Sequence, residues 1–238
     1  MIIPSLILFY KKNPEQFLEI LNWYLFPVRY AHPERFSDTF KDNSELVRRL
    51  SERSSLYARA FSRIMLRLEG LDRDKTFNIP DSLVFLNSLL LERLFFLLGL
   101  AVSWRSIAKE ILGERVRKIK AILSEEGYRF VLKKAPFLFT LEMQTGDEKN
   151  NQETLLIKTL DDIDNLPKTV TLKGMAIFKE AVEPLSIEDR TRLRLKLSPF
   201  LSKMWDTGVS SPIPKDEALS LIKRIIKSER GGNWAASM

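Results

Sequence analysis

The longest apolar stretch of the chain, from Leu83 to Val102, limits the possible folds more than any other feature of the sequence. Its length matches that of a membrane-spanning helix. However, Glu92 and Arg93 lie near its middle, and two charges at that depth in a bilayer cost several kcal/mol. We therefore predict a helix over about residues 82–100 whose circumference is buried mostly by other helices of the same protein.

The region before this stretch has the spacing of amphipathic helices. Asn13-Pro14-Glu15 predicts the start of a first helix, because asparagine caps helices, proline suits their first turn and an acid there favours the helix dipole. Pro27 is expected to end this helix. A longer helix is predicted from Ser44 to Gly70, with its arginines facing outward. Its apolar residues, which are expected to face the core, are Leu46, Leu50, Tyr57, Phe61, Ile64 and Leu68.

Shorter helices are predicted directly after the apolar stretch. Ser103 is expected to cap a helix that Gly113 ends, and Ser124 is expected to open a further helical turn that Pro136 ends. Between them, an apolar side is expected to face inward at Val116, Ile119 and Leu123.

The C-terminal third is also predicted to be helical. A helix is expected over residues 170–182, and Pro214 is expected to open the last helix. The segment Arg192–Leu197 alternates basic and apolar residues, which fits an amphipathic strand as well as a helix that Pro199 would bend. We favour the helix.

Together these patterns predict an all-α protein, an irregular helical bundle packed around the central hydrophobic helix. We expect a single helical domain over residues 1–238, with an N-terminal helical portion over 1–139 and a C-terminal one over 166–230. The stretch 142–165 is polar and acidic, so we expect a linker or excursion there. A glycine pair is expected to release a flexible tail over 231–238.

The residue types on which many enzymes depend are scarce. The chain has no cysteine, and its one histidine is His32. This excludes disulfides, thiolate metal sites and cysteine nucleophiles, and it leaves too few imidazoles for a zinc site. His32 precedes Pro33, where extended backbone is favoured, so we expect an ordinary loop residue. No phosphate loop, nucleophile elbow or paired metal-ligand motif is present. We therefore predict no catalytic, cofactor-binding or metal-binding residue, and no enzyme.

A net charge of +7 indicates an anionic partner, which could be a nucleic acid, an anionic membrane or an acidic protein. Basic residues gather over 48–67, 115–134 and 190–196, where solvated helix faces are the simpler explanation. Nucleic-acid binding is better supported where exposed aromatic residues alternate with basic ones, but the aromatic residues here fall on the apolar stripes. An acidic protein partner is therefore favoured. The candidate partner-binding residues are Arg115, Arg117, Lys118, Lys120, Lys133 and Lys134.

The order of several segments resembles a known family. Residues 91–100 (LERLFFLLGL) resemble the leucine-rich segment of the K subunit of the type III secretion sorting platform, the SctK/YscK family. Apolar residues at similar intervals and the helix EEGYRFVL follow in the same order. Residues 174–184 (GMAIFKEAVEP) look like the family's Gly-Leu-Ala helix, and the basic segment at 192–197 and the closing helix at 219–226 come after it.

This resemblance implies a cytoplasmic adaptor protein with no known catalysis, cofactor or small-molecule substrate. Such proteins connect the cytoplasmic domain of the D subunit, in the inner-membrane ring, to pods built of the Q subunit. The L subunit and the secretion ATPase lie below the pods and are indirect partners. We therefore expect a protein at the cytoplasmic face of the bacterial inner membrane that acts in effector export. A basic all-helical nucleic-acid-binding protein is the alternative hypothesis, although nucleic acid is not the expected partner.

Overall fold

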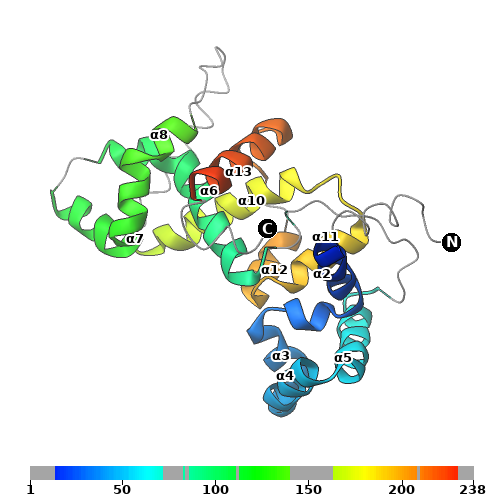
Figure 1. The fold of residues 1–238 in the computed structure, drawn as a ribbon. Coiled ribbons are helices and arrows are strands. Elements are labelled where there is room, and N and C mark those ends of the chain that lie inside the picture. The colour runs from blue at the N-terminus through cyan, green and yellow to red at the C-terminus, as the bar shows by residue number, and fades with distance from the viewer. Residues whose placement is uncertain are drawn as a thin grey trace. The chain divides into compact units, whose positions relative to one another are not determined.

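The computed structural model describes residues 14–71, 83, 86–110, 113–139, 163–207 and 210–229. Every regular element within these residues is a helix (Figure 1), which confirms the all-α prediction. None of the described helices combines the length and the hydropathy that crossing a membrane requires. Most of the predicted acidic excursion and the whole predicted tail lie outside the described residues.

The described residues form two compact units, and the chain passes from one to the other more than once. Unit 1 contains the described residues up to Ser88 and residues 184–203. Unit 2 contains the described residues of 89–183 and of 204–229. The single domain expected over residues 1–238 stays a prediction.

Unit 1 consists of short helices from two distant parts of the sequence. The first helix starts at Pro14 and Pro27 follows its end, both as predicted. The ambiguous segment Arg192–Leu197 is helical as far as Leu195, as favoured. Pro199 does not bend this helix but opens a separate one, α12 (Pro199–Asp206), whose last residues belong to unit 2. Besides α12, the helical elements of unit 1 are α2 (Pro14–Leu25), which is the first helix, η1 (Pro27–Tyr30), α3 (Pro33–Phe40), η2 (Lys41–Asn43), α4 (Ser44–Arg53), α5 (Ser55–Leu68) and α11 (Ile187–Leu195).

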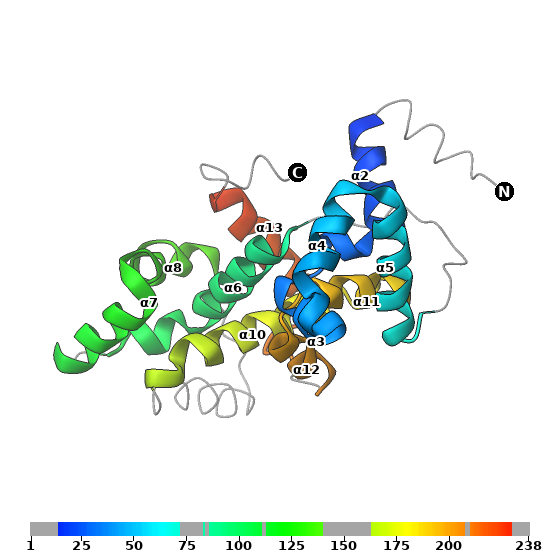
Figure 2. The ribbon, with the colours of Figure 1, turned by 90° about the horizontal axis from the view of Figure 1, so that it is seen from below.

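The continuous helix predicted over residues 44–70 is wrong. Ser54 has the extended backbone angles φ −137° and ψ 125°, and it separates α4 from α5, which pack against each other (Figure 2). The prediction that the large apolar residues of this segment face the core is wrong as well. Most of these side chains are exposed, namely Leu46, Tyr57, Ile64 and Leu68.

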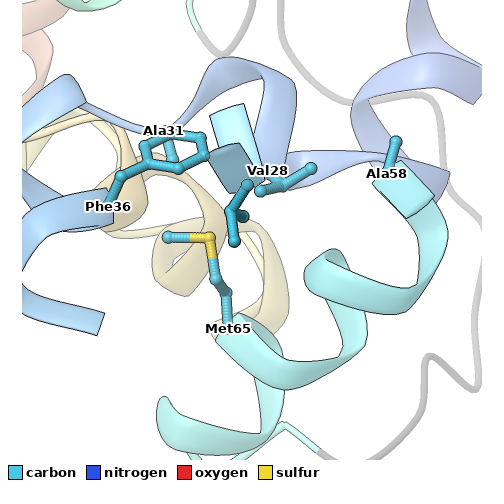
Figure 3. Close-up of a cluster of buried hydrophobic side chains, with 6 residues drawn as sticks. Val28, Ala31, Phe36, Ala58 and Met65 are labelled. Atoms are coloured by element: carbon cyan, nitrogen blue, oxygen red, sulfur yellow. The ribbon is translucent and has the colours of Figure 1, made fainter. Parts of the chain in front are cut away.

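Smaller side chains take their place in the core of unit 1. Ala58 and Ser62 are buried, and because they are small, α5 can lie close to η1. The Ser62 Oγ accepts the backbone N–H of Val28 at 3.2 Å, which satisfies a polar group that would otherwise be buried without a partner. Met65 reaches from the next turn of α5 toward Phe36 in the same cluster (Figure 3).

The C-terminal end of α5 forms as the sequence predicts. Gly70 has φ +79°, a left-handed conformation that glycine adopts readily. The N–H of Leu71 donates to the carbonyl of Leu66 at 2.8 Å, which closes the Schellman motif. The preceding Glu69 accepts from Arg35 at 2.8 Å and also from Arg194. This carboxylate therefore ties the end of α5 to α3 and α11.

Two basic side chains at α11, Arg192 and Lys196, are buried against aromatic rings. The guanidinium carbon of Arg192 lies 4.9 Å from the ring centroid of Tyr24, and the Nζ of Lys196 lies 5.3 Å from that of Tyr30. The Lys196 Nζ also donates to the carbonyl of Leu86 at 3.0 Å. Burial lowers the pKa of Lys196 to about 7, because a low-dielectric surrounding disfavours the charged amine. The solvated face expected for this basic region is therefore wrong for these two side chains.

Unit 2 is built on the predicted central helix. α6 is buried along most of its length, as predicted, but it begins at Ser88 and continues through the buried Ser103 to Ala108. Ser103 is therefore not a helix cap, and Pro136 opens a short helix instead of ending one. The elements are α6 (Ser88–Ala108, all but its first residue), α7 (Gly113–Lys133), α8 (Ala135–Leu138), η4 (Ile163–Asn165), α10 (Leu166–Ala181) and α13 (Lys215–Glu229).

Two glycines make a close helix crossing in unit 2. A Cβ on Gly99 of α6 would overlap the carbonyl of Val170, and a Cβ on Gly174 of α10 would overlap the carbonyl of Phe95. The rings of Phe95 and Phe178 pack beside the crossing, with centroids 5.3 Å apart. The absence of side chains at both positions therefore lets the two backbones meet.

The glycine crossing predicts a large loss of stability for Gly99→Ala and for Gly174→Ala. Alanine suits a helix interior better than glycine by about 1 kcal/mol, but here it would push two backbones apart. We expect each variant to lower the free energy of unfolding by at least about 2 kcal/mol, as measured by urea denaturation. Gly113→Ala is the matched control, because no atom lies within 4 Å of a Cβ there. Equal stability of the three variants would contradict the crossing.

The buried amine of Lys196 predicts a pH-dependent stability. Between pH 7 and 10.5 the unfolded chain holds a proton on this amine that the folded chain has released. The free energy of unfolding should therefore rise with pH in this window, by up to about 1.4 kcal/mol per pH unit from this group. Denaturant titrations between about pH 7 and pH 9 should show a smaller rise for Lys196→Met, and an unchanged rise for Lys203→Met at an exposed lysine. The same slope in Lys196→Met and the wild type would rule out the shifted amine.

Candidate partner-binding surfaces

The six predicted partner-binding residues lie on α7 and directly after it, in unit 2. α7 is interrupted at Ser124, whose φ of 64° and ψ of 165° are not helical. Ser124 thereby opens the second half of α7, as predicted, and its Oγ accepts the backbone N–H of Gly127 at 3.4 Å. The interruption divides the six residues into two groups, with Arg115, Arg117, Lys118 and Lys120 before it and Lys133 and Lys134 after it.

The first group is here named the α7 ridge and consists of Arg115, Arg117, Lys118 and Lys120. Ile119 and Leu123 are the buried residues of this half of α7. At about 100° per residue, Arg117 lies on the side of the helix opposite Ile119. Lys118 and Lys120 lie on either side of Arg117. The ridge therefore presents its charges over a wide arc instead of on one flat face.

Acidic residues neutralise part of the ridge. The Nζ of Lys118 lies 2.8 Å from a carboxylate oxygen of Asp164, and that of Lys120 lies 2.9 Å from one of Glu125. The hydrogen bond from Lys120 holds the pKa of Glu125 below its ordinary value. Among the residues that the structure describes, no carboxylate forms an ion pair with Arg117. Arg117 is therefore the least compensated charge of the ridge.

The second group lies beside exposed apolar side chains. The Nζ of Lys134 is 2.6 Å from Glu229 of α13, which also pairs with Arg93 of α6 at 3.3 Å. This carboxylate holds the end of α7 to two other helices, so Lys134 has a structural ion pair. Phe137 is 84% exposed. With Leu132 and Lys133, which are exposed at the end of α7, it is taken as a second candidate surface, named the α8 corner.

A third candidate surface lies on unit 1. It is named the α5 stripe and consists of Tyr57, Ile64 and Leu68, which are all exposed. The sequence pattern found this stripe by its helical spacing but assigned it to the core. Phe137 was missed because Pro136 was expected to end a helix, whereas Pro136 lies in the first turn of α8 and the exposed Phe137 follows it.

The described residues show no group of three or more His, Cys, Asp or Glu side chains that could hold a metal ion. His32 caps α3, because its Nδ1 accepts the backbone N–H of Glu34 at 3.3 Å. Its own backbone N–H donates to the carbonyl of Leu195 at 2.9 Å. His32 therefore has a local structural role.

Comparison with known proteins identifies one family. Residues 18–226 match the family model described as YOP proteins translocation protein K (YscK). No curated protein and no solved structure matches the chain. The matched range extends from α2 to α13 and so includes helices of both units. It also contains the three surfaces described above. The chain therefore belongs to the YscK family, a structural component of type III secretion that is not known as an enzyme.

Proposed function

We propose that this protein is the adaptor of the type III secretion sorting platform that links the D subunit of the inner-membrane ring to the Q-subunit pods. The L subunit and the secretion ATPase are its indirect partners, and it acts at the cytoplasmic face of the bacterial inner membrane. The observation that carries the proposal is the family match over residues 18–226, since membership in a secretion component implies secretion-system partners.

The division into two compact units supports a linking role. Each unit has its own buried residues and its own exposed candidate surface, the α5 stripe on unit 1 and the α7 ridge and α8 corner on unit 2. A linker needs surfaces for two partners, and separate units supply them without competition for the same residues. We propose that the α7 ridge meets an acidic surface of the D or Q subunit, because complementary charge steers association and selects partners.

The charge of the ridge is tested by the triple variant Arg117→Glu, Lys118→Glu, Lys120→Glu. All three side chains are exposed, so the fold should be kept, as checked by circular dichroism. Pulldown with the purified cytoplasmic domain of the D subunit and with the Q subunit should show a loss of affinity of about tenfold or more for one of them. The expected reason is that attraction to an acidic partner becomes repulsion.

A matched control reverses three other charges of unit 2. Lys223, Arg224 and Lys227 are exposed on α13, and their replacement by Glu changes the net charge by the same amount. If both triple variants lose binding equally, the effect is one of net charge, and if neither does, the ridge is not the partner surface. A filter-binding titration with duplex DNA tests the alternative, since phosphate contacts would make affinity fall steeply with added salt.

A further inference from the structure

The α5 stripe has the geometry of a seam between two helices. Tyr57, Ile64 and Leu68 are 46%, 44% and 69% exposed, and Phe61 lies at their inner edge. At about 100° per residue these four side chains fall within an arc of about 60° on the helix. So narrow a stripe is the seam of a helix pair, whereas a helix that lies on a lipid surface has a wider apolar face.

The stripe is held in place by a row of aromatic rings that begins in the core. The rings of Phe36 and Phe40 have centroids 6.2 Å apart, and those of Phe40 and Phe61 are 5.5 Å apart. Tyr57 stacks on Phe61 at 6.3 Å, which brings the row to the surface. Since the rings brace one another, little side-chain freedom is lost when a partner binds.

Arginines line the other exposed side of α5. Arg59, Arg63 and Arg67 are exposed, and the helix contains no acidic residue from Ser55 to Leu68. Within the described part of the chain, no carboxylate forms an ion pair with Arg59 or Arg63. The exposed surface of α5 is therefore apolar along one edge, and along the other edge three arginines surround the single exposed Leu56.

We propose that the α5 stripe binds an amphipathic, acidic helix of another type III secretion protein. Apolar side chains of that helix would pack against Tyr57, Ile64 and Leu68, and its carboxylates would pair with Arg63. An antiparallel second copy of this chain does not fit, because it would bring two arginine rows together. The partner's class rests on the proposed function, but the stripe is on unit 1 and does not depend on the α7 ridge.

The direct test places a photoreactive group on the stripe. The full chain with p-benzoylphenylalanine in place of Leu68 is expressed together with its secretion system and irradiated. We expect a cross-link to one secretion-system protein, mapped by mass spectrometry to a segment with helical apolar spacing and net negative charge. The same replacement of Leu18, an exposed leucine on α2 of the same unit, should not give this product.

A second test measures affinity with purified components. A synthetic peptide of the mapped segment is titrated against the full chain by fluorescence anisotropy. Ile64→Ser with Leu68→Ser should weaken binding by at least about tenfold, because two apolar anchors are lost. Arg63→Glu should weaken binding and reduce its salt dependence, and Leu18→Ser should bind as the wild type does. All these side chains are exposed, so the variants should remain folded.

Three outcomes would overturn the inference. The first is a Leu68 cross-link that is missing or that maps to a basic or non-helical segment. The second is co-sedimentation with phosphatidylglycerol vesicles that Ile64→Ser with Leu68→Ser abolishes, which would assign the stripe to a membrane. The third is a dimer in light scattering that the same variant dissociates. Failure of the adaptor role is distinguishable, because the stripe would then cross-link to a secretion protein other than the D or Q subunit.

Discussion

Small residues at the places where helices touch determine the rest of this structure. In unit 2, α6 and α10 meet where Gly99 and Gly174 remove the side chains from between them. In unit 1, Ala58 and Ser62 allow α5 to approach η1. Such close approach brings many backbone atoms into van der Waals contact while their hydrogen bonds remain satisfied within the helices. The buried face of a helix is therefore set by where its neighbour can come close, and large apolar side chains can remain outside.

This constraint explains which parts of the fold the sequence predicts. Features that depend on neighbours in the chain were predicted correctly, such as the start of α2 at Pro14 and the end of α5 at Gly70, because caps and turns use local chemistry. The central helix was found from its composition. The inward face of α5 was not predicted correctly, because Ala58, Ser62 and Met65 have the same helical spacing as the larger apolar residues Tyr57, Phe61 and Ile64. Nothing local says which of two such faces a distant segment will cover.

The basic residues show the same division between local and distant information. The α7 cluster was visible in the sequence, but Asp164 and Glu229, which pair with two of its lysines, come from η4 and α13. The burial of Arg192 and Lys196 depends on aromatic rings of α2 and η1, far away in the chain. A basic residue in an alternating segment has the same sequence signature whether it faces water or a ring. Its surroundings decide its role, and these are tertiary.

For an adaptor of the proposed kind, this arrangement has an energetic consequence. Complete burial of one large apolar side chain gains about 1.5–3 kcal/mol, whereas association costs at least about 4 kcal/mol in lost freedom of motion. The few anchors of the α5 stripe or the α8 corner, aided by charges that solvent screens, therefore support only a modest affinity at each surface. Two modest contacts on separate units become strong together once both partners are held in one assembly, because the second contact forms at a high effective concentration. A protein with this distribution of exposed apolar residues would bind a single free partner weakly and the assembled platform firmly.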